Sequence, residues 1–121
     1  MRRLKLKLQL YCGDEIAIGP GKADLLDAID QTGSISAAAR SLGMSYRRAW
    51  LLVDVMNRCF VAALVATKPG GGKAAGAQLT DHGRAILAAY RALSRQVEAG
   101  AVGADLAAIE AALRDAPLPL D

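Results

Sequence analysis

The positions of glycine and serine within residues 33–45 strongly restrict the local fold. Gly33 is followed by Ser34, and Gly43 is followed two residues later by Ser45. Glycine adopts the left-handed conformation that ends helices, and a serine side chain caps a helix start by accepting a backbone N–H. The order therefore predicts that one helix ends, a second begins and ends, and a third begins within this short stretch.

The spacing of these signals predicts three consecutive helices. We expect the first over about 22–31, the second over 37–42 with Ser34 or Ser36 as its cap, and the third over 45–60. The apolar residues of the first helix recur at helical spacing, which supports its assignment. A short helix, a tight turn and a longer helix in succession are typical of a helix-turn-helix motif.

Short strands are expected on both sides of the helical segment. Residues 4–11 alternate leucine with mostly polar residues, which predicts a half-buried strand, and 16–18 is expected to pair with it. After the helices, 63–67 and 77–79 are expected to form a hairpin around the glycine-rich loop 69–76. Such a hairpin is a wing, so the fold class is mainly α with a small β wing, a winged helix-turn-helix.

A long helix is expected to close the domain. Thr80 is a suitable cap, and the helical pattern extends to about Val97. Beyond it lies an alanine-rich amphipathic stretch, 104–116. We therefore divide the chain into a winged helix-turn-helix DNA-binding domain, 1–100, and a C-terminal helical tail, 101–121.

The two C-terminal segments carry more apolar residues than a domain of this size needs for its core. In a monomer these residues would form a large exposed apolar patch, so a partner helix is expected to cover them. The alternative is that the tail folds back on its own domain. The expected interface residues of a homodimer are Ile86, Leu87, Tyr90, Leu93, Val97, Leu106, Ile109 and Leu113.

The charge of the chain is concentrated in its middle. The formal net charge is only +3. Between Gln31 and Thr80, however, Asp54 is the one acidic residue, while the basic residues are Arg40, Arg47, Arg48, Arg58, Lys68 and Lys73. A local basic excess indicates a polyanionic partner.

The predicted third helix has two chemically different sides. A helix turns about 100° per residue, so the apolar side is expected to pack in the core and to include Trp50. Its members are Tyr46, Ala49, Trp50, Val53, Met56, Asn57 and Phe60, and the opposite side carries Arg47, Leu51, Asp54 and Arg58. Arg47 and Arg48 lie in the first turn, where cations oppose the helix dipole, which favours a functional explanation.

No catalytic apparatus is recognisable in the sequence. Cys12 and Cys59 lack metal or redox spacing and are expected to be buried or half-buried free thiols, and His82 is expected to be solvated or to cap a helix. We therefore expect no enzyme, no cofactor and no metal. No apolar run is long enough for a membrane span, and lysines interrupt the N-terminal leucines, so a cytoplasmic protein is expected.

Several motifs in this order resemble the ModE family of molybdate-responsive transcription regulators. Two of the motifs, the segment around Ser34 and the one around Thr80, are also similar to LysR-type regulators. The segments that carry the resemblance are Gly33–Ala39, Gly43–Trp50, Met56–Asn57, Gly70–Lys73 and Leu79–Gly83.

The resemblance implies a homodimeric regulator that binds a two-fold operator in double-stranded DNA through helix 45–60 and the wing. Family members usually add C-terminal modules that bind molybdate; because only 104–121 follow Gly103, we expect an indirect link to molybdate metabolism and no direct binding. The alternative is a protein-interaction module that kept the fold. The expected DNA-contacting residues are Ser34, Ser36, Ser45, Tyr46, Arg47, Arg48, Leu51, Arg58, Lys68, Gly71, Gly72 and Lys73.

Overall fold

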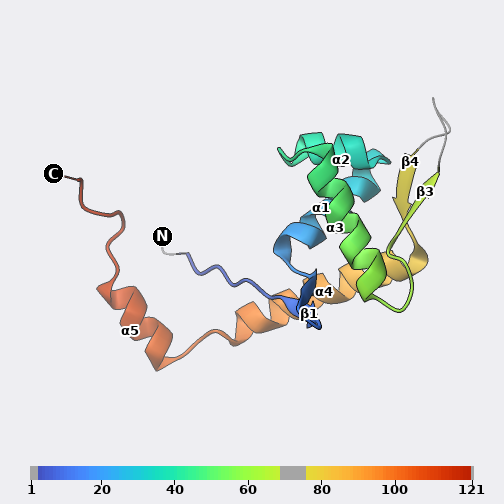
Figure 1. The fold of residues 1–121 in the computed structure, drawn as a ribbon. Helices are drawn as coiled ribbons and strands as arrows, with labels where there is room; N and C mark the ends of the chain where they lie inside the picture. Colours follow the sequence, from blue (N-terminus) through green and yellow to red (C-terminus); the bar gives the residue numbers. More distant parts are fainter. Residues whose placement is uncertain (1–2, 69–75, 121) are drawn as a thin grey trace.

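A computed structural model describes residues 3–68 and 76–120, and Figure 1 shows their arrangement. Four of the helices contribute to a small core, and two antiparallel hairpins flank it. The elements in chain order are β1 (Leu10–Cys12), β2 (Glu15–Ile18), α1 (Pro20–Thr32), α2 (Ile35–Ser41), α3 (Tyr46–Cys59), β3 (Val65–Lys68), β4 (Gly76–Leu79), α4 (Asp81–Gly100) and α5 (Ala104–Ala112).

The predicted helix-turn-helix is confirmed, and its capping chemistry is the expected one. Gly33 ends α1 with φ +76°, and Gly43 lies between α2 and α3 with φ +69°. The hydroxyls of Ser34 and Ser45 each accept a hydrogen bond from the backbone N–H three residues later, at 2.8 Å and 3.1 Å. Ser34, rather than Ser36, is therefore the cap of α2, which begins two residues earlier than expected.

The core lies where α1, α2, α3 and the wing meet. It contains no buried polar or charged side chain among the described residues. Because the chain has few aromatic residues, aliphatic side chains fill this space, and each fully buried one removes apolar surface from water. The largest fully buried side chains are Leu25, Leu26, Ile29, Met56, Leu64 and Leu79.

Polar contacts fix the wing hairpin, β3 and β4, to the helix-turn-helix. The N–H of Ala77 donates to the carbonyl of Gly33, at 2.9 Å, in the turn between α1 and α2. The Asn57 side chain at the end of α3 accepts from the N–H groups of Leu64 and Val65 and donates to the Val65 carbonyl. The wing is thus held beside both helices of the motif.

The predicted N-terminal strand over 4–11 is largely wrong. Only Leu10–Cys12 pair with β2, and residues 3–9 form no regular secondary structure. The segment instead lies against α4, where the Tyr90 hydroxyl donates to the Leu8 carbonyl at 2.7 Å. The alternation of leucine and polar residues predicted an extended segment with two faces, but it could not supply a partner strand for 4–9.

The long helix α4 continues beyond the rest of the domain, and α5 stands apart from it (Figure 1). Arg91 of α4 forms ion pairs with Asp24 and Asp27 of α1, which hold the first half of α4 against the domain. No residue of α5 is buried. The prediction that Leu87 and Tyr90 lie in a dimer interface is wrong, because both pack in the core of the domain. In the ranges 3–68 and 76–120, no helix is long and apolar enough to cross a membrane.

Candidate nucleic-acid interface

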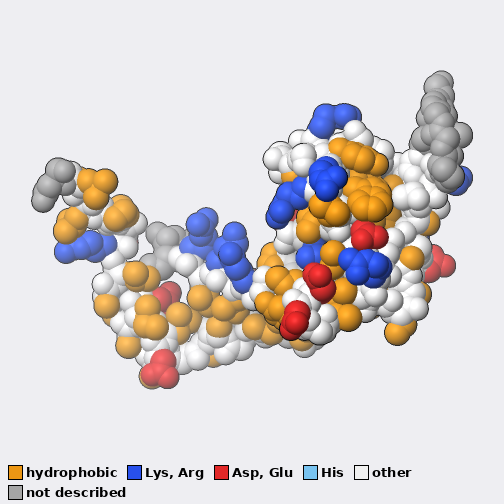
Figure 2. Space-filling model, viewed as in Figure 1, with side chains coloured by type: hydrophobic (Ala, Val, Ile, Leu, Met, Phe, Trp, Pro, Cys, Tyr) orange, Lys and Arg blue, Asp and Glu red, His pale blue; other side chains and the backbone are white. Residues whose placement is uncertain are grey.

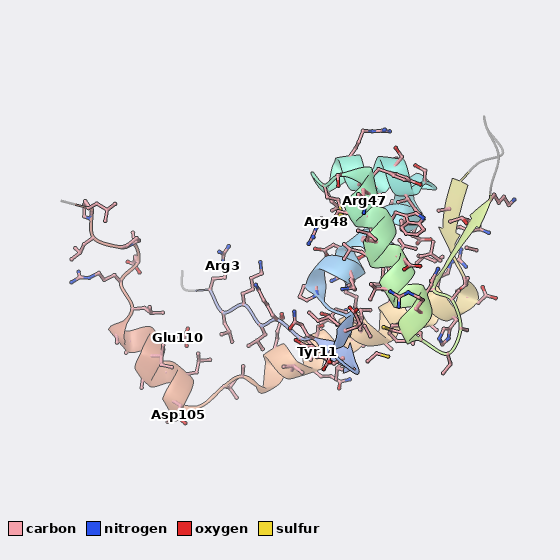
Figure 3. All side chains as sticks on the ribbon, viewed as in Figure 1. Arg3, Tyr11, Arg47, Arg48, Asp105 and Glu110 are labelled. Atoms are coloured by element: carbon pink, nitrogen blue, oxygen red, sulfur yellow. The ribbon has the colours of Figure 1, made fainter. Side chains whose placement is uncertain are left out.

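The start of α3 presents two exposed arginines, Arg47 and Arg48. Figure 3 shows them at the N-terminal end of α3 beside α2, far from the acidic Asp105 and Glu110 of α5. In the part of the chain that the structure describes, neither forms an ion pair, and the first turn of α3 has no acidic residue. Their charges add to the positive end of the helix dipole, so this site favours an anion.

Three other arginines, Arg58, Arg84 and Arg91, are engaged with carboxylates, whereas no ion pair of Arg40, Arg95 or Arg114 occurs among the described residues. Arg58 lies 3.0 Å from Asp54 on the same helix, and Arg84 lies 3.4 Å from Asp81. Arg91 bridges two helices, as described above. Arg47 and Arg48 differ from the paired arginines because their charge is available to an external partner, and they lie together in the first turn of α3.

Basic side chains surround the start of α3. Arg40, at the end of α2, is exposed and donates to the Ser36 hydroxyl at 3.3 Å. Figure 2 shows basic side chains beside an exposed hydrophobic patch over this region, with acidic side chains farther along the same face. The surface combines positive charge with apolar area, a combination that suits the edges and phosphates of a duplex.

The prediction that Trp50 belongs to the core is wrong. Its side chain is 47% exposed, and Tyr46, one turn earlier, is 56% exposed. The buried line of α3 consists of Ala49, Val53 and Met56. Because Ala49 is small, the neighbouring helices approach α3 along this line, and Trp50 is turned about 100° away from it. Tyr46 and Trp50, with Arg47, line a shallow hollow of about 300 Å³.

The remaining predicted site residues differ in their local environments. Ser34 and Ser45 cap helices, and Arg58 is paired with Asp54. Leu51 is exposed on α3, and Lys68 is exposed at the end of β3. The predicted wing residues Gly71, Gly72 and Lys73 lie outside the described residues.

The surroundings of Cys12, Cys59 and His82 differ in part from the sequence-based expectation. Cys59 is half-buried, as expected, but Cys12 is exposed. Burial raises the pKa of the Cys59 thiol, and the interaction of Cys59 with the Cys12 thiol raises this pKa further, so the two cysteines are neighbours. His82 is half-buried, with its ring edge-on to Phe60 at 6.5 Å, rather than solvated, and Thr80 is the helix cap. Among residues 3–68 and 76–120, no cluster of metal-ligating side chains occurs.

Sequence comparison finds related proteins with ModE and Mop names. The chain is 46% identical over 80 residues to the molybdenum-pterin-binding protein MopB of Rhodobacter capsulatus, which is 66% of this chain. It is 44% identical over 77 residues, 64% of the chain, to the molybdenum transport protein ModE of Azotobacter vinelandii. With the DNA-binding transcriptional dual regulator ModE of Escherichia coli K12, the identity is 35% over 92 residues, 76% of the chain. The chain is a homologue of the ModE proteins.

The ModE relatives are much longer than the region that they share with this chain. The matched region covers 30% of MopB, 28% of the Azotobacter protein and 34% of the Escherichia protein. No protein-family model matches the chain. The identities agree with the ModE resemblance that the motifs indicated.

A solved structure supports the fold assignment of this ModE homologue. The DNA-binding domain of CbnR, solved in complex with DNA, superposes with a TM-score of 0.52 and 22% sequence identity. The match covers 75% of this chain and 95% of the CbnR chain. At this low identity the similarity concerns the fold alone, which is the predicted winged helix-turn-helix.

Proposed function

We propose that this ModE homologue is a sequence-specific, double-stranded DNA-binding transcription regulator that places α3 in the major groove. The observation that carries the proposal is the pair Arg47 and Arg48, exposed without a carboxylate partner at the start of the second helix of a helix-turn-helix. Residues at this end of a recognition helix meet base edges and phosphates. Among the relatives, the Escherichia protein is named a DNA-binding transcriptional regulator.

The chemistry of the proposed contacts follows from the side chains present. An arginine can bind a guanine edge through two parallel hydrogen bonds, whereas exposed lysine and hydroxyl groups bind phosphates. We propose the contact set Ser34, Ser36, Ser45, Tyr46, Arg47, Arg48, Leu51, Arg58, Lys68, Gly71, Gly72 and Lys73. Arg58 is expected to contribute least, because DNA must compete with Asp54 for its guanidinium group.

We also propose that the protein binds DNA as a homodimer. The exposed apolar residues Leu93 and Val97 lie one turn apart on α4, and Ile109 on α5 is exposed as well. A second copy would remove these side chains from water and would present two recognition helices to two half-sites. Two-fold operators match such an arrangement.

Binding of the wild-type chain to DNA upstream of its own gene tests the proposal. Fluorescence anisotropy across a salt series separates specific from nonspecific binding, because nonspecific binding is almost entirely electrostatic. Arg47→Ala and Arg48→Ala are each expected to cost about 1–3 kcal/mol of binding free energy if the arginine reads a base. Arg114→Ala, an equal loss of charge at an exposed position beyond α5, is the matched control.

Unchanged operator affinity in both arginine variants would contradict the proposed docking. Loss of affinity in the Arg114 variant to the same extent would indicate a general charge effect. A protein that binds no duplex specifically at low salt would instead be a protein-interaction module.

The names of the relatives suggest which genes to examine. Both MopB and the Azotobacter ModE protein carry molybdenum in their names. We propose that the operators of this protein lie near genes of molybdate metabolism. Genome-wide mapping of bound DNA, with and without molybdate, is expected to locate the sites there, and a map without such genes would contradict this assignment.

A further inference from the structure

Two aromatic side chains lie exposed at the start of α3, Tyr46 and Trp50. Both positions are about half exposed, and Leu51 beside them is 43% exposed. Tryptophan and tyrosine carry large apolar surfaces, and their exposure together is costly in water unless a partner covers them. The core does not use these side chains, since Ala49, Val53 and Met56 form the buried line of the helix.

The geometry places these aromatic rings next to a positive charge. Residues 46 and 50 are one helical turn apart and therefore lie on the same face. Tyr46, Arg47 and Trp50 line one shallow hollow, which is open to solvent. Within the described residues, Arg47 has no carboxylate partner, and the first acidic residue of α3 is Asp54, one turn beyond Trp50.

Charge decides which occupant fits this surface. A hydrophobic peptide would have to cover Arg47 and Arg48 without supplying a matching anion. A DNA duplex supplies phosphates for the arginines and, in its major groove, offers one apolar group, the C5-methyl of thymine. The combination of an aromatic hollow and unpaired arginines therefore fits thymine-containing major groove.

We propose that Tyr46 and Trp50 form an apolar platform that contacts thymine methyl groups of the operator beside the base or phosphate held by Arg47. The platform makes these two aromatic residues determinants of sequence specificity. The proposal rests on the proposed DNA-binding function. It extends that function by naming the chemical group that is recognised and the side chains that recognise it.

Replacement of thymine by deoxyuridine tests the proposal, because it removes only the C5-methyl group. Each thymine of the operator is replaced singly, and dissociation constants are measured by fluorescence anisotropy. At one or two positions, the wild-type protein is expected to bind the uracil operator about fourfold more weakly, the effect of one buried methyl group. Trp50→Ala and Tyr46→Ala are expected to bind thymine and uracil operators alike at those positions, which forms a double-mutant cycle.

Two controls keep the result interpretable. Arg47→Ala is expected to weaken binding while it preserves the thymine-to-uracil ratio. Because Trp50 is exposed, Trp50→Ala is expected to melt close to the wild-type temperature, whereas Met56→Ala, at a fully buried position, is expected to melt lower. If Trp50→Ala also unfolds, Tyr46→Ala, at a position that is 56% exposed, provides the cycle.

The outcomes distinguish this proposal from the function on which it rests. Specific operator binding with no uracil effect at any position overturns the methyl contact and leaves the DNA-binding function intact. Absence of specific binding overturns both. A Trp50 variant with normal DNA affinity but weakened self-association would identify a second copy as the occupant and would also overturn the proposal.

Discussion

The side chains of α3 are divided between core and solvent by the neighbours of the helix. Ala49, Val53 and Met56 are buried, while Tyr46 and Trp50 remain exposed. Helical periodicity alone grouped all of these residues on one side, because it considers the angle around the helix and not the depth of the contact. The small side chain of Ala49 marks the actual line of closest approach.

At the level of single groups, Tyr90 connects the N-terminal segment to α4. Its hydroxyl donates to the Leu8 carbonyl at 2.7 Å, and burial raises the pKa of the phenol. Tyr90→Phe is expected to lower the free energy of unfolding by about 1 kcal/mol, the usual net value of one hydrogen bond. Thermal or denaturant unfolding near neutral pH measures this loss.

The same tyrosine predicts a pH dependence with a defined sign. Because the folded state holds the pKa of Tyr90 above its unfolded value of about 10, the folded state favours the neutral phenol. This contribution is fully present below the unfolded pKa and is lost as the pH rises through the folded pKa. The wild type is therefore expected to lose more stability than Tyr90→Phe at alkaline pH. Tyr11→Phe, at an exposed position, is the control, and equal losses in all three proteins would contradict the assignment.

At the scale of elements, the start of α4 explains the Leu79–Gly83 motif. The Thr80 hydroxyl accepts from the Gly83 N–H at 2.9 Å and donates to the Ala63 carbonyl at 2.7 Å. A Cβ atom at Gly83 would lie 2.1 Å from the Leu64 carbonyl oxygen, so a side chain there requires backbone movement. The motif therefore serves the close packing of α4 against the residues that precede the wing.

The orientation of the wing depends on the Asn57 side chain. Asn57→Ala removes the acceptor for two backbone N–H groups, of which that of Leu64 belongs to a fully buried residue. The variant is expected to lose about 1–3 kcal/mol of stability, because buried donors are left without a partner. Denaturant unfolding gives this value.

An isosteric variant separates the hydrogen bonds that the Asn57 side chain accepts from the one that it donates. Asn57→Asp keeps the acceptor oxygen and loses the donor to the Val65 carbonyl. It is expected to lose less stability than Asn57→Ala if the two accepted hydrogen bonds dominate. An Ala variant as stable as the wild type would show that the wing does not depend on this side chain.

At the scale of the whole molecule, α4 and α5 extend away from the helix-turn-helix. We expect the protein to sediment as a dimer at micromolar concentration, because a second copy would cover the exposed apolar residues of α4. Leu93→Glu is expected to shift the equilibrium toward monomer, since it places a charge in that interface. Sedimentation equilibrium of both proteins measures the change.

A charge change on the opposite side of α4 provides the control for this experiment. Arg95 is two residues, about 200° around the helix, from Leu93, and it is exposed. Arg95→Glu is expected to leave the dimer intact. A monomer mass for the wild type at every concentration would contradict the dimer, and equal dissociation in both variants would place the interface elsewhere.

The local chemistry of the chain was sufficient to predict its helices and their caps. Gly33, Ser34, Gly43 and Ser45 act through bonds within a few residues, so the helix-turn-helix was predictable to within two residues at its boundaries. The excess of basic over acidic residues in 31–80 likewise pointed to the arginines of α3 before any fold was known. The ordered motifs indicated the ModE relationship for the same reason, since they are properties of the sequence itself.

Contacts between residues far apart in the chain were decided only by the tertiary structure. The exposure of Trp50, the neighbouring thiols of Cys12 and Cys59, and the lack of a partner strand for residues 4–9 all depend on which surfaces meet after folding. Periodicity describes the angle of a side chain around its own element, whereas burial depends on the position and bulk of other elements. The sequence by itself therefore determined the motif and its charge, and the packing of α3 against α1 and α2 determined which of its side chains remain exposed for the proposed DNA contact.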